Sequence, residues 1–249
     1  MSNPNSQLWR NYEAFGRERG RLLVHILSNY MDLQGSCVLD FGAGTGAIAL
    51  ECARAKAQVD ALEPNTEKAA FLQQEATSQQ LSVTLIESLP KHAKYDAIIL
   101  LDVIEHLIEP ETWLAQLYNA LKPNGIIYLS TPNKFSPAHV LLDPHFSLPF
   151  LSLARRKTVK RIVADVLEWQ PQQRQDFPEL FSLSQLIQLL EQTDFDWKFI
   201  NRDVVGYAVE HPQALWNRDL HLKIVHIIQK FGARQIRACI SDKYDVFNQ

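Results

Sequence analysis

The sequence has few of the features that mark secreted or membrane-spanning proteins. Its three cysteines, Cys37, Cys52 and Cys239, form neither a C-x-x-C pair nor an even set for a disulfide framework. No apolar run approaches the roughly 18 residues that cross a bilayer, and the polar amino terminus lacks the apolar segment of a signal peptide. These absences predict a cytoplasmic protein in a reducing compartment.

The small net charge and the absence of known catalytic motifs exclude further classes of protein. The formal net charge of −3 gives no general attraction to nucleic acid, so no such partner is expected. There is no P-loop, no G-x-S-x-G elbow and no His/Cys spacing typical of a metal site, so no metal is expected. With 249 residues, 46% of them hydrophobic, and no internal repeat, one α/β domain with additions is the natural expectation.

The most informative stretch is V-L-D-F-G-A-G-T-G at residues 38–46. Its apolar start predicts a buried strand, its glycines a tight turn that lets backbone approach a ligand, and the residues from Thr45 a helix. Free N–H groups at the helix start would face the turn. The spacing is not the G-x-G-x-x-G of dinucleotide sites, and Asp40 beside the turn would repel a pyrophosphate. The turn therefore suits a cationic or hydroxyl-bearing ligand.

Strands and helices alternate along the rest of the chain, which predicts a parallel, doubly wound sheet. Strands are expected over residues 37–41, 57–63, 81–86, 95–101 and 126–133, with a sixth over 197–205 and a seventh over 236–247. One or two amphipathic helices are expected over 7–33, further helices after Asn65 and Glu111, another opened by a capping box at Ser182, and an inserted amphipathic helix over 224–231.

Acidic residues stand at the ends of two predicted strands. Glu63 lies 21 residues after Gly42 and is followed by Pro64, which ends the strand. An acid at this place in nucleotide-binding sheets accepts hydrogen bonds from ribose hydroxyls. Asp102 follows Leu101 at the carboxyl end of the strongest strand, the edge where open α/β sheets bind ligands.

Over residues 36–133 these motifs resemble the class I S-adenosylmethionine-dependent methyltransferases, in particular the ubiquinone-biosynthesis O-methyltransferases and the type 11/23 group. The resemblance rests on the glycine turn, on Y-D-A-I-I-L-L-D-V-I-E-H at 95–106 and on L-K-P-N-G-I-I-Y-L-S-T-P-N at 121–133. It implies a Rossmann-like methyltransferase fold, S-adenosylmethionine as cofactor, and methyl transfer to a small-molecule, lipid-like or glycan acceptor on oxygen. Carbon and nitrogen acceptors, a binding module without catalysis and a nucleotide-dependent oxidoreductase are the alternatives.

The resemblance also implies which residues bind the cofactor. They are Asp40, Gly42, Ala43, Gly44, Thr45, Gly46, Glu63, Pro64, Glu87, Ser88, Leu101, Asp102 and Val103. Glu87 and the Ser88 backbone N–H are expected beside the adenine. In ubiquinone-type relatives an arginine before the glycine turn contacts the cofactor; we assign this role to Arg21, with Arg19 as the alternative.

Four parts are expected along the chain: a helical cap (1–35), a cofactor-binding core (36–133), a substrate-side insertion (134–181) and a carboxyl-terminal completion of the core (182–249). His145 in the insertion is a candidate base or acceptor contact, because neutral imidazole accepts a hydroxyl proton near pH 7. His106 is a second candidate base and His139 a weaker one, although a histidine among apolar residues commonly serves packing. The basic block 155–157 is interpreted as a solvated helix face, with a phosphate-bearing acceptor or peripheral membrane contact as alternatives. Monomer and homodimer both stay open.

Overall fold

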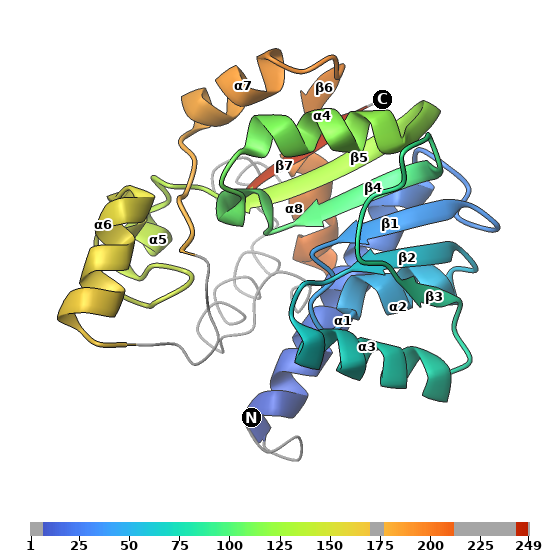
Figure 1. Ribbon diagram of the computed structural model, residues 1–249, viewed down its shortest axis with the longest axis horizontal. Helices are drawn as coiled ribbons and strands as arrows, with labels where there is room; N and C mark the ends of the chain where they lie inside the picture. Colours follow the sequence, from blue (N-terminus) through green and yellow to red (C-terminus); the bar gives the residue numbers. More distant parts are fainter. Residues whose placement is uncertain (1–6, 170–176, 212–242, 249) are drawn as a thin grey trace.

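A seven-stranded sheet runs through the middle of the computed structural model, which describes residues 7–169, 177–211 and 243–248 (Figure 1). The strands are β1 (Cys37–Phe41), β2 (Gln58–Leu62), β3 (Val83–Leu85), β4 (Tyr95–Leu101), β5 (Leu121–Pro132), β6 (Trp197–Phe199) and β7 (Lys243–Asn248). Their order is β3-β2-β1-β4-β5-β7-β6, with β7 antiparallel to both of its neighbours and the other pairs parallel. The expected seven-stranded, mostly parallel sheet is confirmed.

Helices cover both faces of this sheet (Figure 1). One face carries α1 (Gln7–Ser28), α2 (Ala47–Arg54), α3 (Thr66–Ser78) and α8 (Asn201–Glu210); the other carries α4 (Pro110–Ala120) and α7 (Leu183–Glu191). Two short helices of the insertion, α5 (Pro137–Leu141) and α6 (Arg156–Lys160), lie beyond the sheet on one side. Among the described helices, none combines the length and apolar character needed to span a bilayer.

The central strands are apolar almost throughout because both of their faces are buried. In β4, Ala97 and Ile99 pack toward α1 and α2, whereas Ile98 and Leu100 pack toward α4 and α7. Local signals that the sequence predicted also hold: Asn65 caps α3 through its side chain, and a capping box opens α7 at Ser182.

The strand order alone indicates where a ligand would bind, which is the edge of the sheet between β1 and β4. The chain winds outward from β1 toward β3 on one side and from β4 toward β5 on the other. In open α/β sheets, ligands bind outside the carboxyl ends of the strands at such a reversal. The glycine turn follows β1, and Asp102 follows β4, so both predicted motifs lie at the carboxyl ends of these two neighbouring strands.

Helix α1 is a single helix that packs tightly against α2. A Cβ atom on Gly20 would lie 2.6 Å from Glu51 Cγ and 2.7 Å from the Ala47 carbonyl oxygen, so only glycine permits this approach. The neighbouring Arg19 is thereby carried to the edge of the sheet at which β4 ends.

The carboxyl-terminal part differs from the prediction. The strand predicted over 197–205 ends at Phe199, and α8 begins at Asn201. Ile200 and Val204 are both buried in the layer that contains α1, and their four-residue spacing is helical rather than alternating. Within the seventh predicted strand, the described residues form β7 from Lys243; residues 236–242 and the helix predicted over 224–231 lie outside the described residues.

Two strands of the core have different bounds from those predicted. β3 is confined to Val83–Leu85, and β5 begins at Leu121 instead of residue 126. The pairing of β5 with β4 is interrupted after Tyr95, and Asn124 has a φ of 62°, so residues 122–125 form an irregularity within the strand.

Candidate functional site

The glycine turn folds back onto the end of β2. The N–H groups of Gly42 and Ala43 both donate to the Leu62 carbonyl oxygen, at 2.8 and 3.1 Å. The Gly44 N–H donates to Glu63 Oε2 at 2.8 Å, and the Asn65 N–H donates to Glu63 Oε1 at the same distance. Two backbone donors therefore fix the Glu63 carboxylate beside the turn before any ligand arrives.

The three glycines of the turn have different surroundings. All have positive φ, and a Cβ on Gly42 would lie 2.5 Å from Val103 Cγ2, while one on Gly46 would lie 2.1 Å from Leu72 Cδ1. At Gly44 no atom lies within 4 Å of the corresponding position. Gly42 thus serves close packing against the turn after β4, and Gly44 faces open space.

Asp40 lies beneath the turn and is 2% exposed. Its Oδ2 accepts the Ala49 N–H at 3.0 Å, which ties the end of β1 to the first turns of α2. Burial raises the pKa of the Asp40 carboxyl to about 7, the Ala49 hydrogen bond opposes this, and the nearby negative charge of Glu63 adds to it.

This raised pKa predicts a pH-dependent stability. Between about pH 4 and 7 the folded chain holds a proton on Asp40 that the unfolded chain has lost, so stability falls as pH rises and levels off above 7. Relative to an Asp40→Asn variant, the wild-type free energy of unfolding should fall by about 4 kcal/mol over this interval. Urea denaturation from pH 4 to 8 measures the free energy of unfolding, and Asp194→Asn, at an exposed position, is the control. Parallel wild-type and Asp40→Asn curves would contradict the prediction.

At the carboxyl end of β4, Asp102 has a φ of 56°, in the left-handed region. Its Oδ2 forms an ion pair with Arg19 Nη2 at 2.8 Å, and both side chains are about one-fifth to one-quarter exposed. The assignment of the edge arginine to Arg21 is not supported, because Arg21 is half exposed and pairs with Glu18 on its own helix. Arg19, the alternative, reaches the edge because the packing of Gly20 on α2 turns this side of α1 toward it.

The turn after Asp102 meets the insertion at a cluster of titratable side chains. Glu105 is 0% exposed, and its Oε2 accepts the Thr131 hydroxyl at 2.9 Å. Its Oε1 lies 3.8 Å from His145 Nε2, and the rings of His145 and His106 are 4.9 Å apart at 82°. Both predicted histidines therefore lie together. Burial raises the pKa of Glu105 to about 7, with Asp102 adding to the shift and His106 opposing it.

Nitrogen and oxygen atoms of these three side chains lie within 4.8 Å of one another, a grouping that can also attract a cation. The sequence spacing gave no sign of it, because 39 residues separate His106 from His145. Neither the function of the cluster nor the burial of Glu105 could be read from the I-E-H motif alone.

Arg156 anchors the insertion to this turn. Its guanidinium donates to the carbonyl oxygens of Glu105, His106, Leu107 and Phe177, at 2.7 to 3.1 Å. The interpretation of the basic block as a solvated face is therefore wrong for Arg156, although Arg155 and Lys157 are exposed. A planar guanidinium can bind several carbonyls at once, which is why the structure selects arginine here.

Replacing Arg156 by alanine should leave these carbonyl oxygens without their shared donor and lower the free energy of unfolding by about 2–3 kcal/mol. Arg156→Lys should retain only part of the stability that Arg156→Ala loses, because an ammonium lacks the planar array of N–H donors of a guanidinium. Urea denaturation provides the measurement, and Arg155→Ala and Lys157→Ala are neighbouring controls expected to change stability by less than about 0.5 kcal/mol. Equal effects at all three positions would overturn the anchoring role.

The remaining predicted residues distribute as follows. Glu87 and Ser88 are exposed just beyond β3, where the preceding Ile86 N–H bonds to β2. Pro64 is exposed after β2. Thr45, Leu101, Asp102 and Val103 are partly buried around the turn. His139 stands apart, with its Nδ1 3.0 Å from the Asn133 carbonyl oxygen, which fits a packing role.

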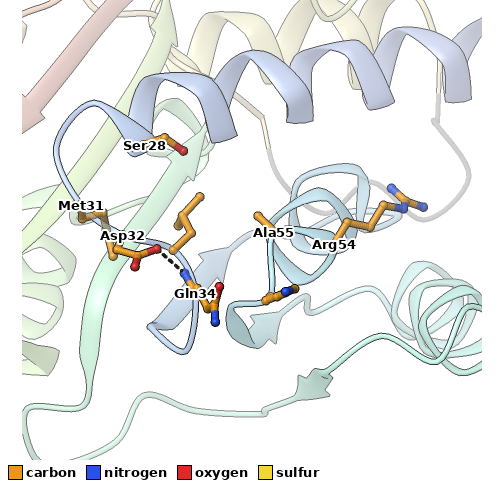
Figure 2. Close-up of a pocket in the computed structure, with 8 residues that line it drawn as sticks. Ser28, Met31, Asp32, Gln34, Arg54 and Ala55 are labelled. Atoms are coloured by element: carbon orange, nitrogen blue, oxygen red, sulfur yellow. Dashed lines mark hydrogen bonds between the residues drawn. The ribbon is translucent and has the colours of Figure 1, made fainter.

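A separate hollow of about 500 Å³ lies at the opposite edge of the sheet (Figure 2). Its lining includes Ser28, Met31, Asp32, Gln34, Arg54 and Ala55. These residues end or follow α1 and α2, shortly before β1 and β2 begin, whereas the glycine turn stands where β1 ends. The hollow is therefore not part of the predicted site.

Fold and turn together define a class I methyltransferase, and comparison with known proteins supports this. Residues 12–197 match the Methyltransf_23 family, described as a methyltransferase domain, and the chain belongs to that family. It is an S-adenosylmethionine-dependent methyltransferase, which excludes the oxidoreductase alternative.

The chain is 30% identical over 182 residues to a ubiquinone biosynthesis O-methyltransferase of Rickettsia felis, covering 71% of this chain and 67% of that protein. Among solved structures, an S-adenosylmethionine-dependent methyltransferase from Mesorhizobium loti has a TM-score of 0.58 at 11% identity, over 90% of this chain and 95% of that one. Magnesium protoporphyrin IX methyltransferase from Synechocystis, with bound SAH, has a TM-score of 0.54 at 16% identity, over 80% and 81%. At these identities the structural likeness concerns the fold.

Proposed function

We propose that this enzyme methylates a hydroxyl oxygen of a small, lipid-like acceptor, with the cofactor at the β1–β4 edge and the acceptor beneath the insertion. The observation that carries the proposal is the position of His145. It reaches the turn after β4, and Val103 of that same turn packs on Gly42 of the glycine turn. The proposed base from the insertion would thus stand close to the glycine turn at which the cofactor would bind.

The cofactor-binding assignments follow from the charges at this edge. Glu63 would accept the ribose hydroxyls, and Glu87 with the Ser88 N–H would meet the adenine. The amino-acid end of the cofactor carries a carboxylate and an ammonium, and the Arg19–Asp102 pair offers one partner of opposite charge for each. The left-handed backbone of Asp102 is the kind of strain that is kept where a side chain must point at a ligand.

When bound, S-adenosylmethionine supplies an activated methyl group on a sulfonium. The tasks left to this chain are to align the acceptor for in-line attack and to take its proton. His145 is the proposed base, and His106 packs edge-on against its ring. Domain roles follow from this: residues 36–133 would bind the cofactor, and 134–181 would select the acceptor.

A lipid-like acceptor is supported by the relatives' printed role in ubiquinone biosynthesis and by the surface of the insertion. That segment exposes several large apolar side chains, namely Phe135, Leu141, Phe150, Val166 and Trp169. Exposed basic residues, Arg155 and Lys157 among them, accompany these side chains, which suits an acceptor with an apolar tail and a polar head.

The test is methyl transfer from methyl-tritiated S-adenosylmethionine to catechols with and without a long alkyl chain. Catechol dimethyl ether, which has no hydroxyl, and an alkylamine are the controls. We expect label in the catechols, more with the alkyl chain, and a roughly 100-fold lower kcat for His145→Gln. Label only in the amine, or no label in any probe from protein that binds the cofactor, would overturn the proposed acceptor.

A further inference from the structure

We propose that Glu105, His106 and His145 bind a divalent transition-metal cation, Zn²⁺ in particular, where the turn after β4 meets the insertion. The inference rests on the proposed function and deepens it. His145 would act as a ligand, so that the acceptor hydroxyl loses its proton by binding the cation and not by direct transfer to the imidazole. The proposal departs from the expectation of no metal, which rested on sequence spacing alone.

The three side chains supply a suitable set of donor atoms. One carboxylate oxygen and two imidazole nitrogens lie within 4.8 Å of one another. Two histidines with one carboxylate are the ligands of many catalytic zinc sites and of sites for other divalent transition metals. Mg²⁺ and Ca²⁺ prefer oxygen ligands alone. The chemistry of this set therefore favours Zn²⁺ over the harder cations.

The distance between Glu105 and His145 fits two ligands of one ion. Glu105 Oε1 and His145 Nε2 are 3.8 Å apart, which is too long for a hydrogen bond. Two ligand atoms that each lie about 2.1 Å from a tetrahedral ion are about 3.4 Å from one another, so a closing movement of about 0.4 Å would suffice. The ring of His106 stands edge-on to that of His145, with 4.9 Å between the ring centres, which brings the third ligand to the same place.

Glu105 Oε1 is a buried oxygen whose hydrogen-bonding capacity is not used. The side chain is 0% exposed, and within the described residues this oxygen accepts no hydrogen bond. A buried carboxylate oxygen without a partner is costly, and an ion is one of the partners that explain such an atom. A cation bound to Oε1 would supply what the chain itself does not.

The surrounding structure holds the proposed ligands in place. The Thr131 hydroxyl, in β5, donates to Glu105 Oε2 at 2.9 Å, which leaves Oε1 for the cation. Asp143 is buried, and its Oδ1 accepts the backbone N–H of His145 at 2.9 Å. Arg156 donates to the Glu105 carbonyl oxygen at 3.1 Å and so joins the insertion to the turn. Supporting hydrogen bonds of this kind orient the ligands of a metal.

Two arginines approach this turn, and both are engaged with other groups. The Arg156 guanidinium donates to backbone carbonyl oxygens, including those of Leu107 and Phe177. Arg19 forms its ion pair with Asp102. The carboxylate of Glu105 is thus left to attract a cation.

A cation at this place would serve the proposed methyl transfer. Three protein ligands leave a position for water or for the acceptor hydroxyl, and a bound cation lowers the pKa of that hydroxyl. The O–H bond then breaks and its proton passes to water, while the oxygen forms a bond to the methyl carbon of S-adenosylmethionine. The carbon–sulfur bond breaks, and its electron pair stays on sulfur, which leaves as the thioether S-adenosylhomocysteine. Water is the one further reactant.

Zn²⁺ binding to the full chain tests the site without any acceptor. Calorimetry on chelator-treated protein should give one Zn²⁺ per chain, with Mg²⁺ bound roughly 100-fold more weakly. Glu105→Gln and His145→Gln, which nearly keep the size of the side chains, should each weaken Zn²⁺ binding by roughly 100-fold. Glu109→Gln and His92→Gln remove an exposed acid and an exposed histidine and should bind normally. Equal binding by the wild type and the two ligand variants, or no saturable binding, would overturn the inference.

Two further readouts report on the ligands and on folding. Co²⁺ in place of Zn²⁺ should give a visible spectrum with the intensity of a four- or five-coordinate ion, lost in Glu105→Gln and in His106→Gln. Saturating Zn²⁺ should raise the wild-type Tm by about 5 °C or more and leave that of the ligand variants unchanged, which also shows that these variants fold. A Co²⁺ spectrum identical to that of the ion in buffer would contradict the site.

Activity with the catechol probe separates this inference from the proposed function. Removal of the cation should lower kcat roughly 100-fold, leave the KM for S-adenosylmethionine unchanged, and be reversed by Zn²⁺. Full activity of protein shown to be free of metal would overturn the inference and leave His145 as the base of the proposed function. Zn²⁺ binding that is lost in the ligand variants, with label only in the alkylamine, would overturn the proposed acceptor and leave the cation site standing.

Discussion

Substituting Gly44 by alanine is expected to weaken S-adenosylmethionine binding by about 100-fold, close to 3 kcal/mol, and to lower the free energy of unfolding by about 1–2 kcal/mol. Gly44 has a φ of 57°, and no atom of the chain lies within 4 Å of where its Cβ would stand. The protein can therefore accommodate the methyl group at a backbone cost of about 1–2 kcal/mol. If the cofactor occupies that open space, the same methyl group collides with it. Isothermal calorimetry measures the affinity, and urea denaturation the stability.

Gly35 provides a matched control. It also has a positive φ, 78°, and open space at its Cβ position, but it precedes β1 and so stands at the opposite edge of the sheet. Gly35→Ala should show a similar loss of stability and wild-type affinity for the cofactor. Equal affinities of the two variants would place the cofactor somewhere other than the turn.

The core of this site could be predicted because its parts are tied together by the sheet. Phe41 pairs with Leu62 in the parallel register of β1 and β2, so the glycine turn and Glu63 must emerge side by side. A strand–turn–helix pattern with an acid at the next strand tip contains enough local information to locate both. The same holds for Asp102, since the apolar run of β4 fixes where that strand ends.

Such local patterns do not predict contacts between segments that are distant in the sequence. Arg19 meets Asp102 across 83 residues, and Arg156 meets the turn after β4 across about 50. In the sequence Arg156 is indistinguishable from its neighbours Arg155 and Lys157, because only the docked position of the insertion decides which of the three is covered. The helix α8 was missed for a related reason: its buried face is defined by α1, at the other end of the chain.

Glu63→Ala is expected to reduce affinity for S-adenosylmethionine by about 100- to 10,000-fold. Hydrogen bonds to a charged acceptor contribute about 1.5–3 kcal/mol each, and the proposed geometry gives Glu63 two ribose hydroxyls. The carboxylate also holds the N–H groups of Gly44 and Asn65, so part of the loss would come from a loosened turn. Calorimetry at one pH and salt concentration gives the comparison with the wild type.

Two variants separate these contributions. Glu63→Gln keeps one carbonyl oxygen and the side-chain shape, so it should hold the turn while losing the charged acceptor, and its affinity should fall between those of the wild type and Glu63→Ala. Glu67→Ala removes an exposed acid one turn further along and should bind normally, which excludes a long-range charge effect. NADH, which also carries ribose, should bind none of the proteins that keep the Glu63 carboxylate, because this charge beside the turn would repel its pyrophosphate. Normal cofactor affinity in Glu63→Ala would show that the ribose does not bind at the tip of β2. It would also contradict the proposed position of the cofactor along the β1–β4 edge.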